Sequence, residues 1–402
     1  MLESADKVLD WPFPRTKSGC PADVLAELRA QPPCVVRIPA GAAQSRRAWL
    51  ITKYAEVRQA LMDPRLSADE TLPGAPVRIQ VDPSQKPGSF LRMDDPEHAR
   101  LRGLIATEFT ARRVRRLQPA VQKLIDELLD DLVGRPRPTD LQDVFSRKLP
   151  TLVIARLLGV PDEDSPYFVE KTRVTISQGD PARSYAAYTE MSEYLGVLAK
   201  RKLDDPQDDM MSRLAVDHLA TGHITLDELV GIARLVLVAG HETTTNQIAL
   251  NILSLLTDDA LRAEVLADDG ALIPQYVEEA MRYWSISQDA IVRQALEDVE
   301  MGGVVMRKGD AVVISIPAGN HDPSVFPHPD RIDLNRDSGK HLQWGNGPHY
   351  CQGAPLARLE MDLALRTLFG RFPTLRLAAD DPDSVFRTGT VFHGVRHLPV
   401  TW

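Results

Sequence analysis

The stretch WGNGPHYCQG, residues 344–353, places one cysteine between two segments with opposite backbone preferences. The two glycines and the proline before it disfavour a helix and allow the backbone to approach a neighbour closely. The run APLARLEMDLALRTLF after it favours a helix with a proline in its first turn. A thiolate at Cys351 would face the N-terminal end of that helix, where unpaired N–H groups and the helix dipole stabilise an anion.

Two other interpretations of this stretch remain open. A lone cysteine, taken without its context, is most often an inert residue of the core. The Gly-x-Gly pattern also occurs in nucleotide-binding loops, but here the third glycine is missing and no buried strand clearly precedes it.

The composition of the 402-residue chain is that of a globular protein, with 43% hydrophobic and 26% charged residues. A net charge of −9 disfavours a general nucleic-acid binder, because neutralising phosphates requires a surplus of lysine and arginine. The opening MLESADKVLDWPFPRTK has no secretion signal and no run reaches transmembrane length, so we expect no membrane anchor. Three cysteines without a CxxC pair argue against a disulfide framework or a zinc site and favour a reducing cytoplasm.

The pattern of hydrophobic residues predicts a mainly α fold with small β-sheets. Helical spacing dominates residues 23–30, 98–133, 152–158 and 185–202, whereas AWLITK, the segment from Val299 and the C-terminal segment resemble strands. No repeat or long polar linker divides the chain, so we expect one large domain over residues 1–402, with the proline-rich stretch 73–88 as a loop.

One long central helix is predicted from Thr225 to Asp258. It begins with a capping box formed by Thr225 and Glu228, and about 31 helical residues would span about 46 Å, enough to cross the molecule. Its middle, AGHETTTN, holds a glycine and three β-branched residues where alanine or leucine would form helix better. Threonine hydroxyls there can bond the carbonyl four residues back.

The centre of this helix is a candidate site for proton transfer. Gly240 is expected to leave a notch beside the helix axis, in which the carboxylate of Glu242 and the hydroxyl of Thr243 could hold waters and pass protons to a ligand. An ordinary polar helix face is the alternative.

Two further motifs carry paired charges. In EEAMR, Glu279 and Arg282 lie three apart on one helix face, and PDRIDLNR offers Arg331 as a joining cation; an isolated surface ion pair is the alternative. In MDDPEHARLRG, we expect a helix with its N-cap at residue 95, from which His98 and Arg102 project on one face and can clamp an anion. A solvated helix end is the alternative there.

These elements together resemble the cytochrome P-450 haem-thiolate monooxygenases, especially the soluble bacterial ones. DPEHARLR, LVAGHETT, GNHDPSVFPHPDR and HYCQGAPLARLE follow one another in the family's order, and the resemblance covers essentially the full chain. It implies the cytochrome P-450 fold. The chain departs from the family's usual pattern by having Trp344, His321 and Ile332 where phenylalanine, arginine and phenylalanine are usual.

The resemblance implies haem b (iron protoporphyrin IX) as the cofactor. Cys351 would be the axial thiolate and metal ligand, which favours cleavage of the dioxygen bond. His98, Arg102, Arg293 and His349 would bind the two haem propionates. Glu279, Arg282 and Arg331 would form an internal ion network that supports the cysteine loop.

The implied activity is the insertion of one oxygen atom from O2 into a mid-sized hydrophobic substrate, by hydroxylation or epoxidation, in bacterial natural-product biosynthesis. Glu242 and Thr243 match the family's acid–alcohol pair, which helps deliver protons to bound oxygen. By family position the substrate pocket would be lined by the loop 77–90 and by Val236, Ala239, Ile286, Ile291, Val391 and Phe392.

Electrons would come from a separate ferredoxin or flavodoxin with its reductase, because the chain has no flavin domain and no dinucleotide fingerprint. TARRVRRLQ carries Arg112, Arg113, Arg115 and Arg116, a candidate docking face for an acidic partner, with an ordinary solvated helix face as the alternative.

Three other functions remain open. A haem-binding sensor or carrier would need the thiolate but not Glu242 and Thr243. A family member could catalyse an atypical oxidative coupling. In a nucleotide-binding or purely structural helical protein, Cys351 would be a core residue and the purified protein would be colourless.

Overall fold

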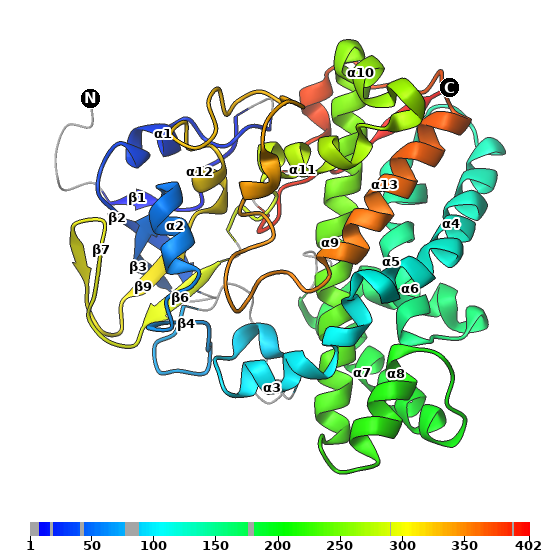
Figure 1. The fold of residues 1–402 in the computed structure, drawn as a ribbon, viewed down its shortest axis with the longest axis horizontal. Helices are drawn as coiled ribbons and strands as arrows, with labels where there is room; N and C mark the ends of the chain where they lie inside the picture. Colours follow the sequence, from blue (N-terminus) through cyan, green and yellow to red (C-terminus); the bar gives the residue numbers. More distant parts are fainter. Residues whose placement is uncertain are drawn as a thin grey trace.

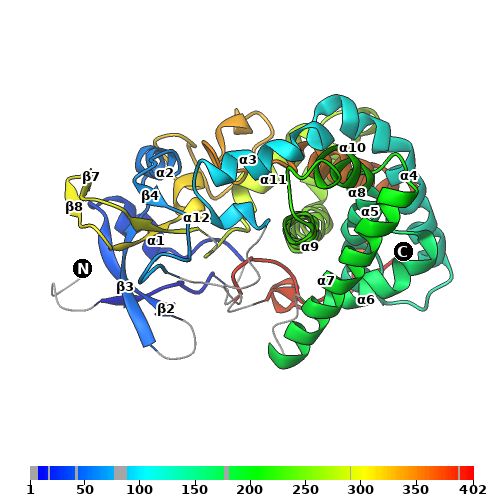
Figure 2. The same cartoon turned by 90° about the horizontal axis from the view of Figure 1, so that it is seen from below.

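A computed structural model describes residues 8–16, 19–40, 44–76, 88–175, 181–289, 291–387 and 390–402. Most strands gather at one end of the molecule and most helices at the other, with helix α9 running between them (Figure 1). Viewed from below, α9 is seen end-on between the two parts (Figure 2). The predicted mainly α architecture with small sheets and a long central helix is confirmed.

The helices follow one another along the whole chain. They are α1 (Val24–Arg29), α2 (Tyr54–Ala60), α3 (Glu97–Leu104), α4 (Ala111–Val133), α5 (Lys148–Leu158), α6 (Ser165–Thr175), α7 (Pro181–Asp204), α8 (Met210–Arg213), α9 (Leu226–Thr257), α10 (Asp259–Gly270), α11 (Ile273–Trp284), α12 (Ile316–Asn320) and α13 (Ala354–Arg371).

The strands form small sheets built from distant segments. They are β1 (Leu9–Asp10), β2 (Cys34–Ala40), β3 (Gln44–Ile51), β4 (Leu66–Ser67), β5 (Thr139–Asp140), β6 (Val292–Ala295), β7 (Val299–Met301), β8 (Val304–Met306), β9 (Ala311–Ile314), β10 (Arg376–Leu377) and β11 (Pro399–Thr401). The main sheet has the order β1-β2-β3-β9-β6-β4, a second has β10-β11-β5, and β7 pairs with β8. The early, middle and C-terminal segments that resembled strands therefore do contain strands.

Helix α9 begins and ends where its sequence predicts. The Thr225 hydroxyl accepts a hydrogen bond from the Glu228 backbone N–H at 3.2 Å, and the Glu228 carboxylate accepts one from the Thr225 N–H at 2.8 Å. The helix continues through AGHETTTN, where the Thr243 hydroxyl donates to the Ala239 carbonyl at 2.7 Å. Buried residues run along most of α9, so tertiary packing outweighs the weak helix preference of its centre.

The expected notch at Gly240 is filled by another helix. A Cβ atom on Gly240 would lie 2.8 Å from the Cδ1 atom of Ile154 in α5. The glycine therefore lets α5 pack closely against α9 rather than leaving space for water, and the notch prediction is wrong.

The predicted helical stretch 98–133 is divided into α3, a 3-10 turn at Ala106–Phe109 and α4. The division follows from Thr110, whose hydroxyl caps α4 by accepting from the Arg113 N–H. Helix α3 has Pro96 as its N-cap, so the expected N-cap at residue 95 is one residue too early. The Asp95 carboxylate still accepts from the Ala99 N–H at 3.1 Å, because it stands just before the first turn.

The largest hydrophobic core surrounds α9. Residues of α4, α5, α7, α11 and α13 join it in one buried cluster, while two smaller clusters lie at the main sheet. Within the described ranges, no helix combines the length and the apolar character that crossing a membrane would require.

Candidate functional site

The cysteine loop is held in shape by its backbone. Cys351 donates its N–H to the Trp344 carbonyl at 2.7 Å, and Gly345 and Gly347 adopt φ angles of +77° and +78°, which favour glycine. A Cβ atom on Gly347 would also lie 3.1 Å from the Leu61 carbonyl oxygen, so the loop passes close to the end of α2. Helix α13 starts three residues after the cysteine, as the sequence predicts.

Cys351 is a half-buried free cysteine. Burial raises the pKa of its thiol, and the backbone N–H groups of Gly353 and Ala354 together with Arg102 oppose that rise without cancelling it. The N-terminal end of α13 thus favours the thiolate as predicted, but the effect of burial on the pKa of the Cys351 thiol is larger. A coordinated metal ion deprotonates a thiol outright, so this surrounding is compatible with metal ligation.

Four basic residues from three segments meet near the cysteine. His98 and Arg102 lie in α3, Arg293 in β6 and His349 in the cysteine loop. The Arg102 guanidinium donates to the Tyr350 carbonyl of that loop at 2.6 Å. The rings of His98 and His349 are 4.2 Å apart, centroid to centroid. The structure therefore brings together all four residues that were predicted to bind an anion.

The charges of this cluster are only partly compensated, by Asp95 at 3.0 Å from the Nδ1 atom of His98 and by Asp94 and Glu70, which oppose the lowering of the Arg293 pKa. Burial lowers the pKa of Arg293 to about 10, and its guanidinium donates to the Val292 carbonyl at 2.8 Å. Burial lowers the pKa of His349 to about 3, with further lowering by Arg293, His98 and Arg102. Within the described part of the chain, the buried Nε2 atom of His98 has no hydrogen-bond partner. Donors and positive charge with few partners fit a ligand that carries carboxylates.

The acid on α9 has a partner that the sequence did not indicate. Arg387 donates to the Glu242 carboxylate at 2.6 Å, and the Asn246 amide donates to the same oxygen at 3.2 Å. Burial pushes the pKa of Glu242 up, but Arg387, His241 and Asn246 together bring it below its ordinary value. Because 145 positions separate Arg387 from Glu242, no local pattern could have linked them.

The predicted pocket residues fall on three segments of the chain. Val236, Ala239 and Thr243 follow helical spacing and so share one face of α9. Ile286 and Ile291 bound a segment that runs beside Val391 and Phe392. In that pairing, Ile286 accepts from the His393 N–H at 2.8 Å and Val391 accepts from the Asp289 N–H at 3.2 Å. Of the predicted loop 77–90, residues 77–87 lie outside the described part of the chain.

Glu279 and Arg282 form a fully buried ion pair rather than a surface one. The guanidinium of Arg282 donates to both carboxylate oxygens of Glu279, at 2.8 and 2.9 Å. The joining cation is Arg336, whose Nε lies 3.1 Å from Glu279, and not Arg331 as predicted. Arg331 contributes its backbone carbonyl, which accepts from Arg282 at 2.9 Å, while its side chain is turned outward.

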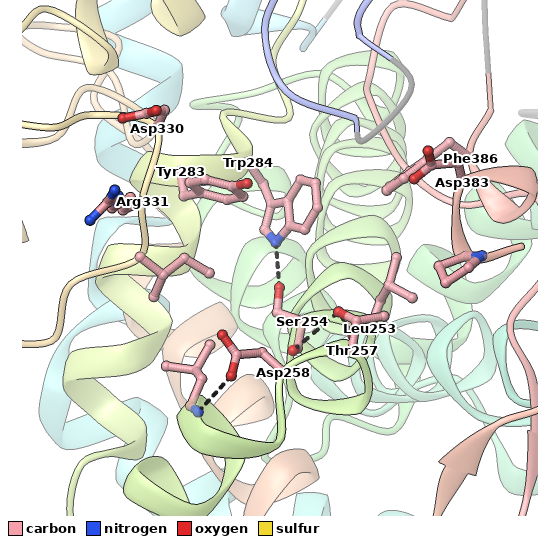
Figure 3. Close-up of a pocket in the computed structure, with 13 residues that line it drawn as sticks. Leu253, Ser254, Thr257, Asp258, Tyr283, Trp284, Asp330, Arg331, Asp383 and Phe386 are labelled. Atoms are coloured by element: carbon pink, nitrogen blue, oxygen red, sulfur yellow. Dashed lines mark hydrogen bonds between the residues drawn. The ribbon is translucent and has the colours of Figure 1, made fainter.

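The Arg331 side chain belongs instead to a separate cleft of about 490 Å³ (Figure 3). Tyr283, Trp284 and Phe386 form aromatic walls of this cleft, and Asp258 and Asp330 border it. None of the residues predicted to bind a cofactor or to transfer protons lines it, so the cleft is distinct from the cysteine site.

A charged network that the sequence did not predict supports Trp344 of the cysteine loop. Glu278 in α11 accepts from Arg358 at 2.6 Å and lies 3.1 Å from the His341 ring. Although burial raises the pKa of Glu278, hydrogen bonds from Arg358 and His341 outweigh it and lower that pKa to about 2. The Arg358 guanidinium also covers the Trp344 ring at 4.8 Å. The network therefore joins α11 and α13 to the loop that carries Cys351.

This protein is similar to a class of helical proteins. The class is defined by a cysteine loop ahead of a helix and a basic cluster beside that loop. The family model "Cytochrome P450" matches residues 187–395. Cytochrome P450 GfsF of Streptomyces halstedii is 40% identical over 414 residues, which cover 100% of this chain and 98% of that protein. The crystal structure of GfsF has a TM-score of 0.92 at 39% identity, covering 98% of this chain and 100% of that chain.

A second relative is named for the reaction that it catalyses. The mycinamicin VIII C21 methyl hydroxylase of Micromonospora griseorubida is 36% identical over 395 residues, which cover 98% of this chain and 99% of that protein. Its crystal structure bound to mycinamicin VIII has a TM-score of 0.88 at 35% identity, covering 98% of this chain and 100% of that chain.

The chain belongs to the cytochrome P450 family. The resemblance stated from the sequence and the predicted fold are thereby confirmed. The protein is an enzyme, a haem-thiolate monooxygenase, and the haem-binding sensor or carrier and the nucleotide-binding protein are not favoured.

Proposed function

We propose that this monooxygenase uses haem b and inserts one oxygen atom from O2 into a mid-sized hydrophobic natural product. The observation that carries the proposal is the position of Cys351. It follows a loop fixed by two glycines with positive φ, precedes the N-terminal end of α13, and lies beside four basic residues. We include in the proposal a single domain over residues 1–402 and a cytoplasmic location, the latter supported by three free cysteines.

The residues present fit a haem. The Cys351 thiolate would bind the iron, and His98, Arg102, Arg293 and His349 would bind the propionates. In the part of the chain that the structure describes, the Nε2 atom of His98 has no hydrogen-bond partner and the Arg293 guanidinium donates to the Val292 carbonyl. A carboxylate would supply the missing acceptors, which supports this assignment. When bound, a thiolate-ligated haem supplies activation of dioxygen.

Glu242 and Thr243 would carry protons toward the bound oxygen. The Thr243 hydroxyl lies on the same helix face as Ala239, to whose carbonyl it donates, so it can accept a proton on its free lone pair. Glu242 directly precedes Thr243 in the chain and can exchange protons with solvent through its carboxylate. Replacing Thr243 by alanine is expected to divert electrons to hydrogen peroxide, whereas serine at this position should retain coupled turnover.

The substrate class is supported by the relatives and by the proposed pocket wall. Val236, Ala239, Ile286, Val391 and Phe392 are apolar and favour a hydrophobic molecule. Relatives are named for mycinamicin VIII, nocardicin C and pentalenic acid, which supports a role in secondary metabolism. Hydroxylation or epoxidation are the reactions we propose, with an atypical oxidative coupling as the alternative.

We propose a separate ferredoxin or flavodoxin, with its reductase, as the electron donor. Arg112, Arg115 and Arg116 are exposed on α4 and support docking of an acidic partner, whereas Arg113 is held by ion pairs with Glu108 and Asp208.

Turnover under ¹⁸O2 tests the proposal. The holoenzyme would be supplied with a surrogate ferredoxin, its reductase and a panel of hydrophobic natural products preselected by their effect on the haem spectrum. The expected result is a product that contains one ¹⁸O atom from dioxygen. Products without ¹⁸O would contradict the proposal and point to oxidative coupling.

A further inference from the structure

The cleft shown in Figure 3 lies outside the proposed haem site and has the size of a small-molecule site. Its volume of about 490 Å³ lies within the range of about 300–1,000 Å³ that is typical of ligand pockets. It is lined by the C-terminal end of α9, the start of α10, the end of α11 and the segments 330–332 and 382–386. Among the described residues that line it, none belongs to the cysteine loop or to the proposed substrate pocket.

Three aromatic side chains that line the cleft are inclined to one another. The ring centroids of Tyr283 and Trp284 are 5.0 Å apart with their planes at 80°, and those of Trp284 and Phe386 are 5.7 Å apart with their planes at 49°. Each ring carries negative potential over its face, so rings that are inclined around one space favour a cation in that space. Aromatic cages of this kind bind substituted ammonium groups.

The polar ends of Tyr283 and Trp284 are already held by hydrogen bonds. The Nε1 atom of Trp284 donates to the Ser254 hydroxyl at 2.9 Å, and that hydroxyl donates to the Leu250 carbonyl at 3.0 Å. The Tyr283 hydroxyl lies 3.2 Å from the Sγ atom of Cys20. Both side chains therefore offer ring carbons rather than a hydrogen-bonding group to a ligand, and their positions are fixed before it binds.

Acidic side chains dominate the charge of the cleft. Asp258, Asp330 and Asp383 line it, whereas Arg331 is the one cation among the described residues that do so. All three carboxylates are exposed, and Asp258 also caps α10 by accepting from the Leu261 N–H at 2.9 Å. Because carboxylates outnumber the guanidinium three to one, the cleft attracts a cation and repels an anion.

We propose that this cleft binds an organic cation, namely a substituted ammonium group with an apolar substituent. The ammonium group would lie against the rings of Tyr283, Trp284 and Phe386, with Asp330 and Asp383 beside it. The apolar substituent would contact the aliphatic side chains of α9 and α10 that complete the lining. Since the cleft is distinct from the cysteine site, it can be occupied while the haem site holds its own ligand.

Calorimetric titration of the holoenzyme with benzyltrimethylammonium tests the proposal. The haem site is first saturated with an azole, so that the probe cannot bind there. We expect saturable binding of the cation, about tenfold or more tighter than that of phenylmethanesulfonate, which has a similar size but carries a negative charge. Equal binding of the two probes, or no saturable binding of the cation, would overturn the proposal.

Substitutions in the cleft identify the groups that hold the cation. The double variant Asp330→Asn, Asp383→Asn should weaken binding about fivefold, and Phe386→Leu about threefold, because charge attraction or a ring face is lost. Arg331→Gln should strengthen binding about twofold, because a repelling charge is removed. Asp380→Asn, which changes an exposed carboxylate outside the cleft, is the matched control and should leave the affinity unchanged. Wild-type affinity in both the double variant and Phe386→Leu would contradict the assignment.

The indole N–H resonance of Trp284 reports binding at the cleft directly. It would be assigned in the azole-bound holoenzyme by its loss in Trp284→Phe. Titration with benzyltrimethylammonium should shift this resonance with the same dissociation constant as the calorimetric one. Saturable binding that leaves the resonance unmoved would place the cation elsewhere and refute the site.

Discussion

The imidazole rings of His98 and His349 lie 4.2 Å apart, centroid to centroid, although one stands in α3 and the other in the cysteine loop. Arg102 and Arg293 add their charges, which lower the pKa of His349 further after burial has lowered it. Like charges gather at a cost in free energy unless an anion compensates them. The cluster is therefore built for a ligand that carries negative charge.

Removing one cation of this cluster should weaken haem retention without weakening the haem-free protein. Arg293→Gln is expected to lower haem affinity about tenfold or more, because a charge-assisted bond to a propionate is lost. The measurement is the rate of haem transfer to an acceptor protein, together with the haem-to-protein ratio after purification. Arg307→Gln serves as the control on an exposed ion pair. Equal transfer rates for the two variants would refute propionate binding by Arg293.

Gly240 is expected to be required by packing rather than by chemistry. Gly240→Ala should lower the free energy of unfolding by about 1–3 kcal/mol, because its Cβ would meet Ile154 at 2.8 Å. In an Ile154→Ala background the same change should instead raise it by up to about 1 kcal/mol, since alanine forms helix better than glycine. Urea unfolding of the four proteins measures both effects. A loss of equal size in both backgrounds would show that Ile154 is not the cause.

Substitutions of Arg331 and Arg336 test which of the two is the cation that joins the Glu279–Arg282 ion pair. Arg336→Gln should destabilise the protein by about 3 kcal/mol, because it leaves the buried carboxylate of Glu279 with one cation fewer. Arg331→Gln should change stability by no more than about 0.5 kcal/mol, since that side chain is exposed. Urea unfolding compares them. A larger loss of stability for Arg331→Gln than for Arg336→Gln would show that Arg331 is the joining cation, as the sequence predicted.

Charge reversal on α4 tests the docking face. A variant carrying Arg112→Glu, Arg115→Glu and Arg116→Glu should be reduced more slowly by a surrogate ferredoxin, by about tenfold at low salt, because electrostatic steering is reversed. Binding of an azole to the haem iron, followed by its spectral shift, should not change. Reduction at the wild-type rate would rule out this face as the docking site.

The sequence predicted the features that depend on local chemistry. The capping box fixed the start of α9, and the proline after the cysteine loop marked the first turn of α13. The spacing of His98 and Arg102 on one helix face indicated an anion clamp, family resemblance added Arg293 and His349, and the structure places the four together.

Features that depend on tertiary contacts could not be predicted. The glycine at position 240 predicts a notch beside the helix axis. Only the position of Ile154 in the structure shows that this space is filled. Arg336 follows Arg331 by five residues, and nothing in the sequence tells which side chain turns inward. The pairing of Glu242 with Arg387 joins segments 145 positions apart and has no sequence pattern.

Ligation of haem iron by the sulfur of Cys351 is tested most directly by the absorption spectrum of the reduced, carbon monoxide-treated protein. The wild type should show the red-shifted band of thiolate-ligated haem. Cys351→Ser should lose that band, whereas Cys34→Ser, which changes another free cysteine, should keep it. An intact band in Cys351→Ser, or its absence in the wild type, would contradict the account.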